Sequence, residues 1–194
     1  MPALDHLLRA AQITIRDITY LVIGTGPGSF TGLRVGFSVA KGICHGLNVP
    51  IIGVSSLEAL ASQLPLTRYP VCAMLRSRKQ EVFTALFEWS SQKKLLRHTN
   101  DTCLTFEDLP GFLQKKTLFI GNDFKTQGPL IKNIMGDKAL LAAAHLWNLK
   151  ASAVGHIGLK RIKDQNYDHL RDLVPAYLRP PDIRPNLFPP LPRA

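Results

Sequence analysis

The hydrophobic positions in the first third of the chain alternate between helix-like and strand-like spacing. Leu4, Leu7 and Leu8 share one face of a helix that we predict over residues 2–11. Residues 18–24 form an uncharged run rich in β-branched side chains, which is typical of a buried strand. The chain therefore opens, on this pattern, with a helix followed by a strand.

A second helix and a second strand follow. Apolar side chains recur at helical spacing over residues 31–47, and residues 50–54 predict another short strand. Ser55 and Glu58 have the spacing of a capping box, so we expect a third helix from Ser55 to about Leu64. The order helix, strand, helix, strand, helix predicts an α/β fold with parallel strands.

The pattern changes after a linker at residues 64–70. Two apolar runs flank a charged turn and predict an antiparallel hairpin, over residues 71–75 and 81–89. Short helices are expected beyond it, together with a strand and an amphipathic helix: helices over 104–114 and 128–134, a strand over 117–122 and the amphipathic helix over 148–163. We therefore expect three parts: a first α/β lobe (1–66), a second α/β lobe with a C-terminal helix (67–179), and a Pro-rich extended tail (180–194).

A glycine-rich loop joins the first strand to the second helix within residues 21–34. A dinucleotide-binding loop would need glycine where the chain has Ser29. A Walker loop would need a lysine at its end, and the next lysine is Lys41. The sequence therefore matches neither phosphate-binding loop, although an anion on the free N–H groups of residues 29–33 stays open as an alternative.

The residues after the strand predict a sharp turn and a helix start. Gly26, Pro27 and Gly28 form the turn, and either Ser29 or Thr31 caps the helix that follows.

Small residues recur at every fourth position of this helix: Gly32, Gly36, Ala40 and Cys44. A ridge with little side-chain bulk lets another element approach closely. Each glycine costs about 0.8–1 kcal/mol of helix stability relative to alanine, so the close approach must offset that cost. The ridge either packs inside this chain or forms a helix–helix interface with a partner.

The charge balance favours a polyanionic partner. The 194 residues carry a formal net charge of +10, with 45% hydrophobic residues, which is an ordinary globular composition apart from the charge. Arg76, Arg78 and Lys79 form the strongest local candidate for contact with RNA or phosphate, and a solvated turn is the alternative. Three widely spaced cysteines without a C-x-x-C pair favour a reducing, cytoplasmic setting. No apolar run is long enough to span a membrane.

The sequence predicts no metal site and no catalytic residue. Its six histidines show no H-x-x-x-H spacing. Ser29 lies in G-P-G-S-F rather than in the G-x-S-x-G pattern of a nucleophile elbow.

Three stretches carry a resemblance to a known family. The longest is GTGPGSFTGLRVGFSVAKGICHGLNVPIIGVSSLEALA, which closely resembles the characteristic segment of the TsaB (YeaZ) family of bacterial tRNA threonylcarbamoyladenosine biosynthesis proteins. Weaker similarity continues in VCAMLRSRKQEVFTALF and TLFIGND, and LVPAYLR at residues 173–179 is similar to the family's C-terminal P-x-Y-L-R.

The resemblance implies the duplicated actin/Hsp70-like (ASKHA) fold and a non-catalytic scaffold role. Members pair with TsaD, the catalytic paralogue, and with the ATPase TsaE, or with themselves, in the complex that modifies the adenosine beside the anticodon of tRNAs reading codons that start with A. No cofactor is expected in this chain, because the complex uses ATP and a metal through its partners. The matching partner interface would consist of Leu4, Leu7, Leu8, Gly32, Leu33, Gly36, Phe37 and Ala40.

The sequence departs from the family pattern in three places. Family members begin with a strand and hairpin ahead of the helix matching residues 2–11, so we expect the first lobe to lack its opening strands. Arg76 stands where members commonly carry Asp, and the tail at residues 180–194 has no counterpart. Two other functions stay open: a nucleotide-dependent enzyme of the same fold, and a truncated remnant without stable complex formation.

Overall fold

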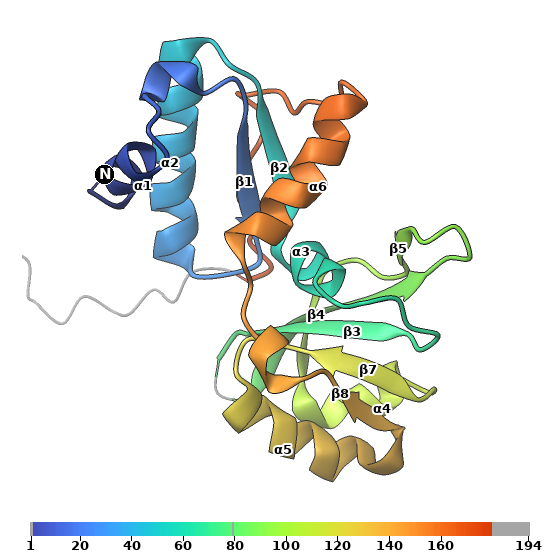
Figure 1. The fold of residues 1–194 in the computed structure, drawn as a ribbon. Helices are drawn as coiled ribbons and strands as arrows, with labels where there is room; N and C mark the ends of the chain where they lie inside the picture. The colour runs from blue at the N-terminus through green and yellow to red at the C-terminus, as the bar shows by residue number, and fades with distance from the viewer. Residues whose placement is uncertain (1, 79, 180–194) are drawn as a thin grey trace, which may run out of the picture.

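The computed structural model describes residues 2–78 and 80–179, and it has the expected α/β architecture in two lobes (Figure 1). One lobe is built on a two-stranded sheet and the other on a six-stranded sheet. Lys79 and the tail at residues 180–194 lie outside the described residues.

The smaller sheet pairs β1 (Leu21–Gly26) and β2 (Ile51–Ser55) in parallel, with Leu21 opposite Ile51. Helix α2 (Phe30–Leu47) lies on one face and α6 (Ala151–Lys163) on the other (Figure 1). Successive strand residues point to opposite faces, so the apolar runs of β1 and β2 are covered on both sides. Helix α1 (Pro2–Ala10) contributes no buried residue.

The larger sheet is mixed, in the order β5-β4-β3-β7-β8, with β6 also paired to β4. Strands β3 and β4 form the expected antiparallel hairpin, and β7 and β8 extend it in parallel. The strand bounds are β3 Val71–Arg76, β4 Glu81–Trp89, β5 Leu95–Arg97, β6 Thr102–Thr105, β7 Thr117–Ile120 and β8 Ala139–Leu141.

Helices cover both faces of the larger sheet. Helix α3 (Ser56–Ser62) packs against β3 and β4 and also contacts β1, β2 and α6, so it joins the two lobes. Helices α4 (Leu109–Phe112) and α5 (Phe124–Met135) lie on the opposite face (Figure 1). Short 3-10 turns complete the chain: Ile15–Asp17, Phe106–Asp108, Gly136–Lys138 and Ala144–Leu146.

The helix predicted over residues 104–114 forms only in part, over residues 106–112. Thr102–Thr105 forms β6, which pairs with Glu81 to Thr84 of β4. Only a 3-10 turn and the four residues of α4 follow it. Non-local pairing with β4 has overridden the helical spacing of the apolar residues, and Pro110 and Gly111 keep α4 short.

Helix α6 belongs to the second segment of the sequence but packs on the sheet of the first lobe. Its Val154 joins the cluster of Ile52 and Val54 from β2. The division of the chain at residues 66 and 67 stays a prediction.

Candidate functional site

The glycine-rich loop after β1 turns the chain tightly into α2. Gly26 has φ +103°, a conformation that favours glycine. A Cβ atom there would also lie 3.0 Å from the Leu33 Cδ1 and 3.3 Å from the carbonyl oxygen of Ala176. The turn therefore needs glycine for its backbone and for the close approach of the C-terminal segment.

Ser29 caps the start of α2. Its Oγ accepts a hydrogen bond from the Gly32 N–H at 3.2 Å. Thr31, the alternative cap, lies inside the helix and is exposed. The helix ends at Asn48, which has left-handed backbone angles.

The segment at residues 173–179 forms contacts with both lobes. The Ala176 N–H donates to the carbonyl oxygen of Thr25 at the end of β1, at 2.8 Å. Arg179 forms an ion pair with Glu81 at the start of β4. The sequence showed this segment only as a family-like motif, and gave no signal that it bridges the lobes.

An aromatic and cationic stack lies where this segment meets α2. The rings of Phe30 and Tyr177 lie 4.9 Å apart, and the Arg34 guanidinium lies 3.9 Å from the centre of the Phe30 ring. The Arg34 Nε also donates to the Tyr177 hydroxyl oxygen at 3.2 Å. Arg34 and Tyr177 are 143 residues apart in sequence, so no local sequence pattern connects them.

The predicted basic turn projects from the β3–β4 hairpin. The Arg76 N–H donates to the Asn122 Oδ1 at 2.9 Å, which fixes the backbone at the end of β3. The Arg76 side chain is 61% exposed, and its Nη1 lies 3.9 Å from the Asp123 Oδ2. Hydrogen bonds from Thr126, and to a lesser extent the charge of Arg76, lower the pKa of Asp123. Lys79 lies outside the described residues.

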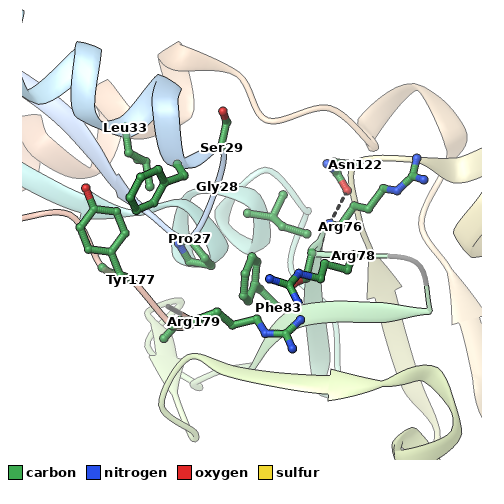
Figure 2. Close-up of a pocket in the computed structure, with 15 residues that line it drawn as sticks. Pro27, Gly28, Ser29, Leu33, Arg76, Arg78, Phe83, Asn122, Tyr177 and Arg179 are labelled. Carbon is green, nitrogen blue, oxygen red and sulfur yellow. Dashed lines mark hydrogen bonds between the residues drawn. The ribbon is translucent and has the colours of Figure 1, made fainter. Parts of the chain in front are cut away.

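These elements surround one cleft between the lobes, with a volume of about 670 Å³ (Figure 2). The glycine loop and the first turn of α2 form one wall, and the β3–β4 hairpin forms the other. Arg76, Arg78 and Arg179 lie on the cleft, together with the aromatic rings of Phe83 and Tyr177 (Figure 2). The structure thus brings two residues of the predicted basic turn beside the predicted glycine turn and Ser29.

The residues predicted for a partner interface do not all lie on the surface. Phe37 and Ala40 are both buried, and Ala40 packs with Ile51 of β2, so these two are core residues, as a correction to the prediction. Gly36 also faces inward, because a Cβ there would lie 3.8 Å from the Ile23 Cδ1 of β1. Leu7 and Gly32 are exposed, and the others are half-buried: Leu4, Leu8, Leu33 and Gly36. The small-residue ridge therefore packs, over most of its length, inside the chain.

The exposed face of α2 carries a different set of small residues. Val35 is 59% exposed, and Ser38 and Gly42 follow it at helical spacing. A Cβ at Gly42 would meet no atom within 4 Å. Val35 and Leu7 of α1 are thus exposed apolar side chains, and Ser38 and Gly42 add little bulk beside Val35.

The described residues contain no cluster suited to a metal ion. No group of three or more His, Cys, Asp and Glu side chains there could hold a metal ion. Burial raises the pKa of the Cys72 thiol to about 12, so it stays protonated. In residues 2–78 and 80–179, no helix is both long and apolar enough to cross a membrane.

Comparisons of sequence find similarity to proteins of tRNA threonylcarbamoyladenosine synthesis. The sequence model of the TsaD family, described as tRNA N6-adenosine threonylcarbamoyltransferase, matches residues 1–176. The tRNA threonylcarbamoyladenosine biosynthesis protein TsaB of Bacillus subtilis is 30% identical over 182 residues, which covers 92% of this chain and 77% of that protein. The Escherichia coli protein of the same name is 36% identical over 92 residues, covering 45% of this chain and 39% of that protein.

Comparison of structures supports the same fold. A Pseudomonas aeruginosa protein described as similar to peptidase YeaZ superposes with a TM-score of 0.74 at 21% identity, covering 92% of this chain and 82% of that chain. YeaZ from Pseudomonas aeruginosa superposes with a TM-score of 0.69 at 19% identity, covering 90% of this chain and 82% of that chain. The two-lobed α/β architecture is therefore the actin-like fold that the sequence predicted.

Proposed function

The chain belongs to the TsaB family, and from that membership we propose that it is a non-catalytic scaffold and activating subunit for the synthesis of N6-threonylcarbamoyladenosine in tRNA. The observation that carries the proposal is the 30% identity to TsaB of Bacillus subtilis across 92% of this chain. The modified adenosine would be the one beside the anticodon, in tRNAs that read codons starting with A. This function places the chain in the cytoplasm.

The proposed partners are a TsaD-type catalytic subunit and a TsaE-type ATPase. ATP and a metal ion would enter the reaction through these partners. Self-association through the same surface would give a homodimer when the catalytic subunit is absent.

We propose that the catalytic subunit packs against the exposed faces of α1 and α2. Leu7 is 63% exposed and Val35 is 59% exposed, which leaves large apolar side chains without cover. Of the interface predicted from the sequence, Leu4, Leu8, Gly32 and Leu33 remain part of this proposal, whereas Gly36 faces Ile23 of the chain's own sheet. The structure adds Val35 and Gly42.

The test uses Gly42, where bulk can be added without disturbing the fold. A leucine at Gly42 points into open space, so Gly42→Leu should fold normally and block the close approach of a partner helix. Gly36→Leu would be a poorer test, because Gly36 faces Ile23 inside the chain. The matched control is Gly155→Leu on α6, where the glycine also has open space.

The measurement is co-purification of the full chain with the catalytic subunit from the same cell. We expect Gly42→Leu to reduce recovery of the complex at least tenfold and Gly155→Leu to leave it unchanged, with both melting temperatures close to the parent value. Undiminished association of a folded Gly42→Leu variant would remove this surface from the proposal. A parent chain that fails to associate, or a reconstituted complex equally active without it, would remove the proposed function itself.

A further inference from the structure

We propose that the cleft between the lobes binds a single-stranded segment of RNA, so that this chain contacts the tRNA directly. This inference rests on the proposed function for the identity of the RNA. It rests on the cleft itself for the chemistry of binding.

Three guanidinium groups converge on the cleft from separate parts of the chain. Arg76 ends β3, Arg78 lies in the hairpin turn, and Arg179 lies in the C-terminal segment (Figure 2). Guanidinium groups present planar sets of N–H donors that match phosphate oxygens. Convergence of three of them on a single cleft favours a ligand with more than one phosphate.

Carboxylates near the cleft pair with part of this charge and leave Arg76 exposed. Glu81 forms an ion pair with Arg179 and offsets the charge of that arginine. Asp123 approaches Arg76 only at 3.9 Å, beyond hydrogen-bond distance, and its carboxylate already accepts a hydrogen bond from the Thr126 N–H at 3.1 Å. Arg76 remains 61% exposed, so its donors can reach a phosphate without breaking a close ion pair.

Aromatic rings lie among these arginines. Phe30, Phe83 and Tyr177 line the same cleft, and Tyr177 is 43% exposed. The ring is held in place by Phe30 at 4.9 Å and by the hydrogen bond from Arg34 to its hydroxyl oxygen. Unpaired bases of RNA stack on such rings while arginines follow the backbone.

This combination distinguishes single-stranded RNA from other polyanions. A double-stranded helix buries its base faces and would leave the aromatic rings unused. An acidic protein surface would use the arginines but gains nothing specific from an exposed, fixed ring. The net charge of +10 supplies a general attraction that brings RNA to the surface, and the cleft supplies the local site.

The experiment compares two double variants with the same loss of charge. Arg76→Gln with Arg78→Gln removes two charges from the cleft. Lys160→Gln with Lys163→Gln removes two exposed charges from the end of α6, which lies away from the cleft. Binding of a fluorescein-labelled anticodon-arm RNA from a tRNA reading a codon that starts with A is measured by anisotropy, with the full chain, at several salt concentrations.

We expect the arginine variant to weaken binding at least tenfold and to reduce the slope of log K against log salt by about 2, one for each lost phosphate contact. The lysine variant should change binding less than threefold. Tyr177→Leu, which keeps an apolar contact with Phe30 but removes the ring, should weaken binding of single-stranded RNA about fivefold or more. Binding of a duplex RNA of equal length should be insensitive to Tyr177→Leu.

Equal losses in the two double variants would show general charge attraction and overturn the cleft as the site. A free adenine nucleotide that displaces the RNA at equal concentration would overturn RNA as the occupant. The arginine variant should still co-purify with the catalytic subunit. If the arginine variant binds RNA poorly but associates normally with the catalytic subunit, the inference stands. If the parent chain binds RNA at the cleft but never associates with the catalytic subunit, the proposed function is wrong and the RNA site remains.

Discussion

The guanidinium of Arg161 holds both carboxylate oxygens of Asp168. Nη1 lies 3.0 Å from Oδ2, and Nη2 lies 3.0 Å from Oδ1. The pair covers the edge of β2 that faces away from β1: the Gly53 N–H donates to the Asp168 Oδ2 at 2.7 Å, and the Arg161 Nη1 donates to the Gly53 carbonyl oxygen at 2.8 Å. A two-stranded sheet thus has backbone groups on one edge satisfied by side chains from a distant segment.

Replacing Asp168 should destabilise the small lobe. Asp168→Asn removes the charge that holds Arg161, and a hydrogen bond to a charged group contributes about 1.5–3 kcal/mol. We expect a loss of that order in the free energy of unfolding, measured by urea titration. Asp172→Asn serves as control, because Asp172 is 83% exposed and its pair with His169 lies on the surface; its effect should stay within about 0.5 kcal/mol.

The same pair predicts a pH dependence of stability. Burial alone would raise the pKa of Asp168, but hydrogen bonds from Arg161 and Gly53 and the charge of Arg161 outweigh it, so the pKa lies below its ordinary value. A lowered folded-state pKa stabilises the protein above the unfolded value of about 3.9 and ceases to do so as the pH falls through the folded value. Urea titrations at pH 7, 5, 4 and 3 should therefore show the gap between the parent and Asp168→Asn closing below about pH 4. A gap that stays constant to pH 3 would contradict this assignment.

Two glycines in α6 should respond to alanine in opposite directions. A Cβ at Gly158 would lie 2.4 and 2.5 Å from the two Cγ atoms of Val22 in β1, so Gly158→Ala must push the helix off the sheet. We expect it to destabilise by about 1–3 kcal/mol. Gly155 has open space, and Gly155→Ala should stabilise by about 0.5–1 kcal/mol through helix propensity. The measurement is the melting temperature of both variants. Equal changes in melting temperature would mean that α6 does not pack tightly against Val22 at Gly158.

The elements that the sequence predicts well are those with local signals. The uncharged runs of β1 and β2, the apolar stripe of α2 and the turn of the β3–β4 hairpin all appear near their expected bounds. Strands β5, β6 and β8 have only three or four residues, which is too short for a clear alternating pattern. β5 pairs with the adjacent β4, whereas β6 and β8 pair with residues farther away in the sequence.

The residues of the candidate site likewise divide into those with a local sequence signal and those without one. The sequence identified Ser29 and the arginines of the hairpin turn, because a glycine turn and a run of basic residues are visible locally. It gave no sign that Tyr177 and Arg179 join them, since only the fold brings the C-terminal segment to the cleft. Helical spacing likewise indicated that Phe37 and Ala40 share one face of α2. It did not show that both side chains are buried within this chain.

The start of α2 gives a final prediction, because the sequence left two candidates for its cap. Ser29 accepts the Gly32 N–H at 3.2 Å, whereas Thr31 is exposed within the first turn. Ser29→Ala should therefore cost about 0.5–2 kcal/mol of stability, and Thr31→Ala should stay within about 0.5 kcal/mol. Because α2 packs on β1 and forms one wall of the cleft, Ser29→Ala should also speed amide exchange in its first turn while leaving α5 unchanged. If Thr31→Ala proves the more damaging of the two, the cap has been assigned to the wrong side chain.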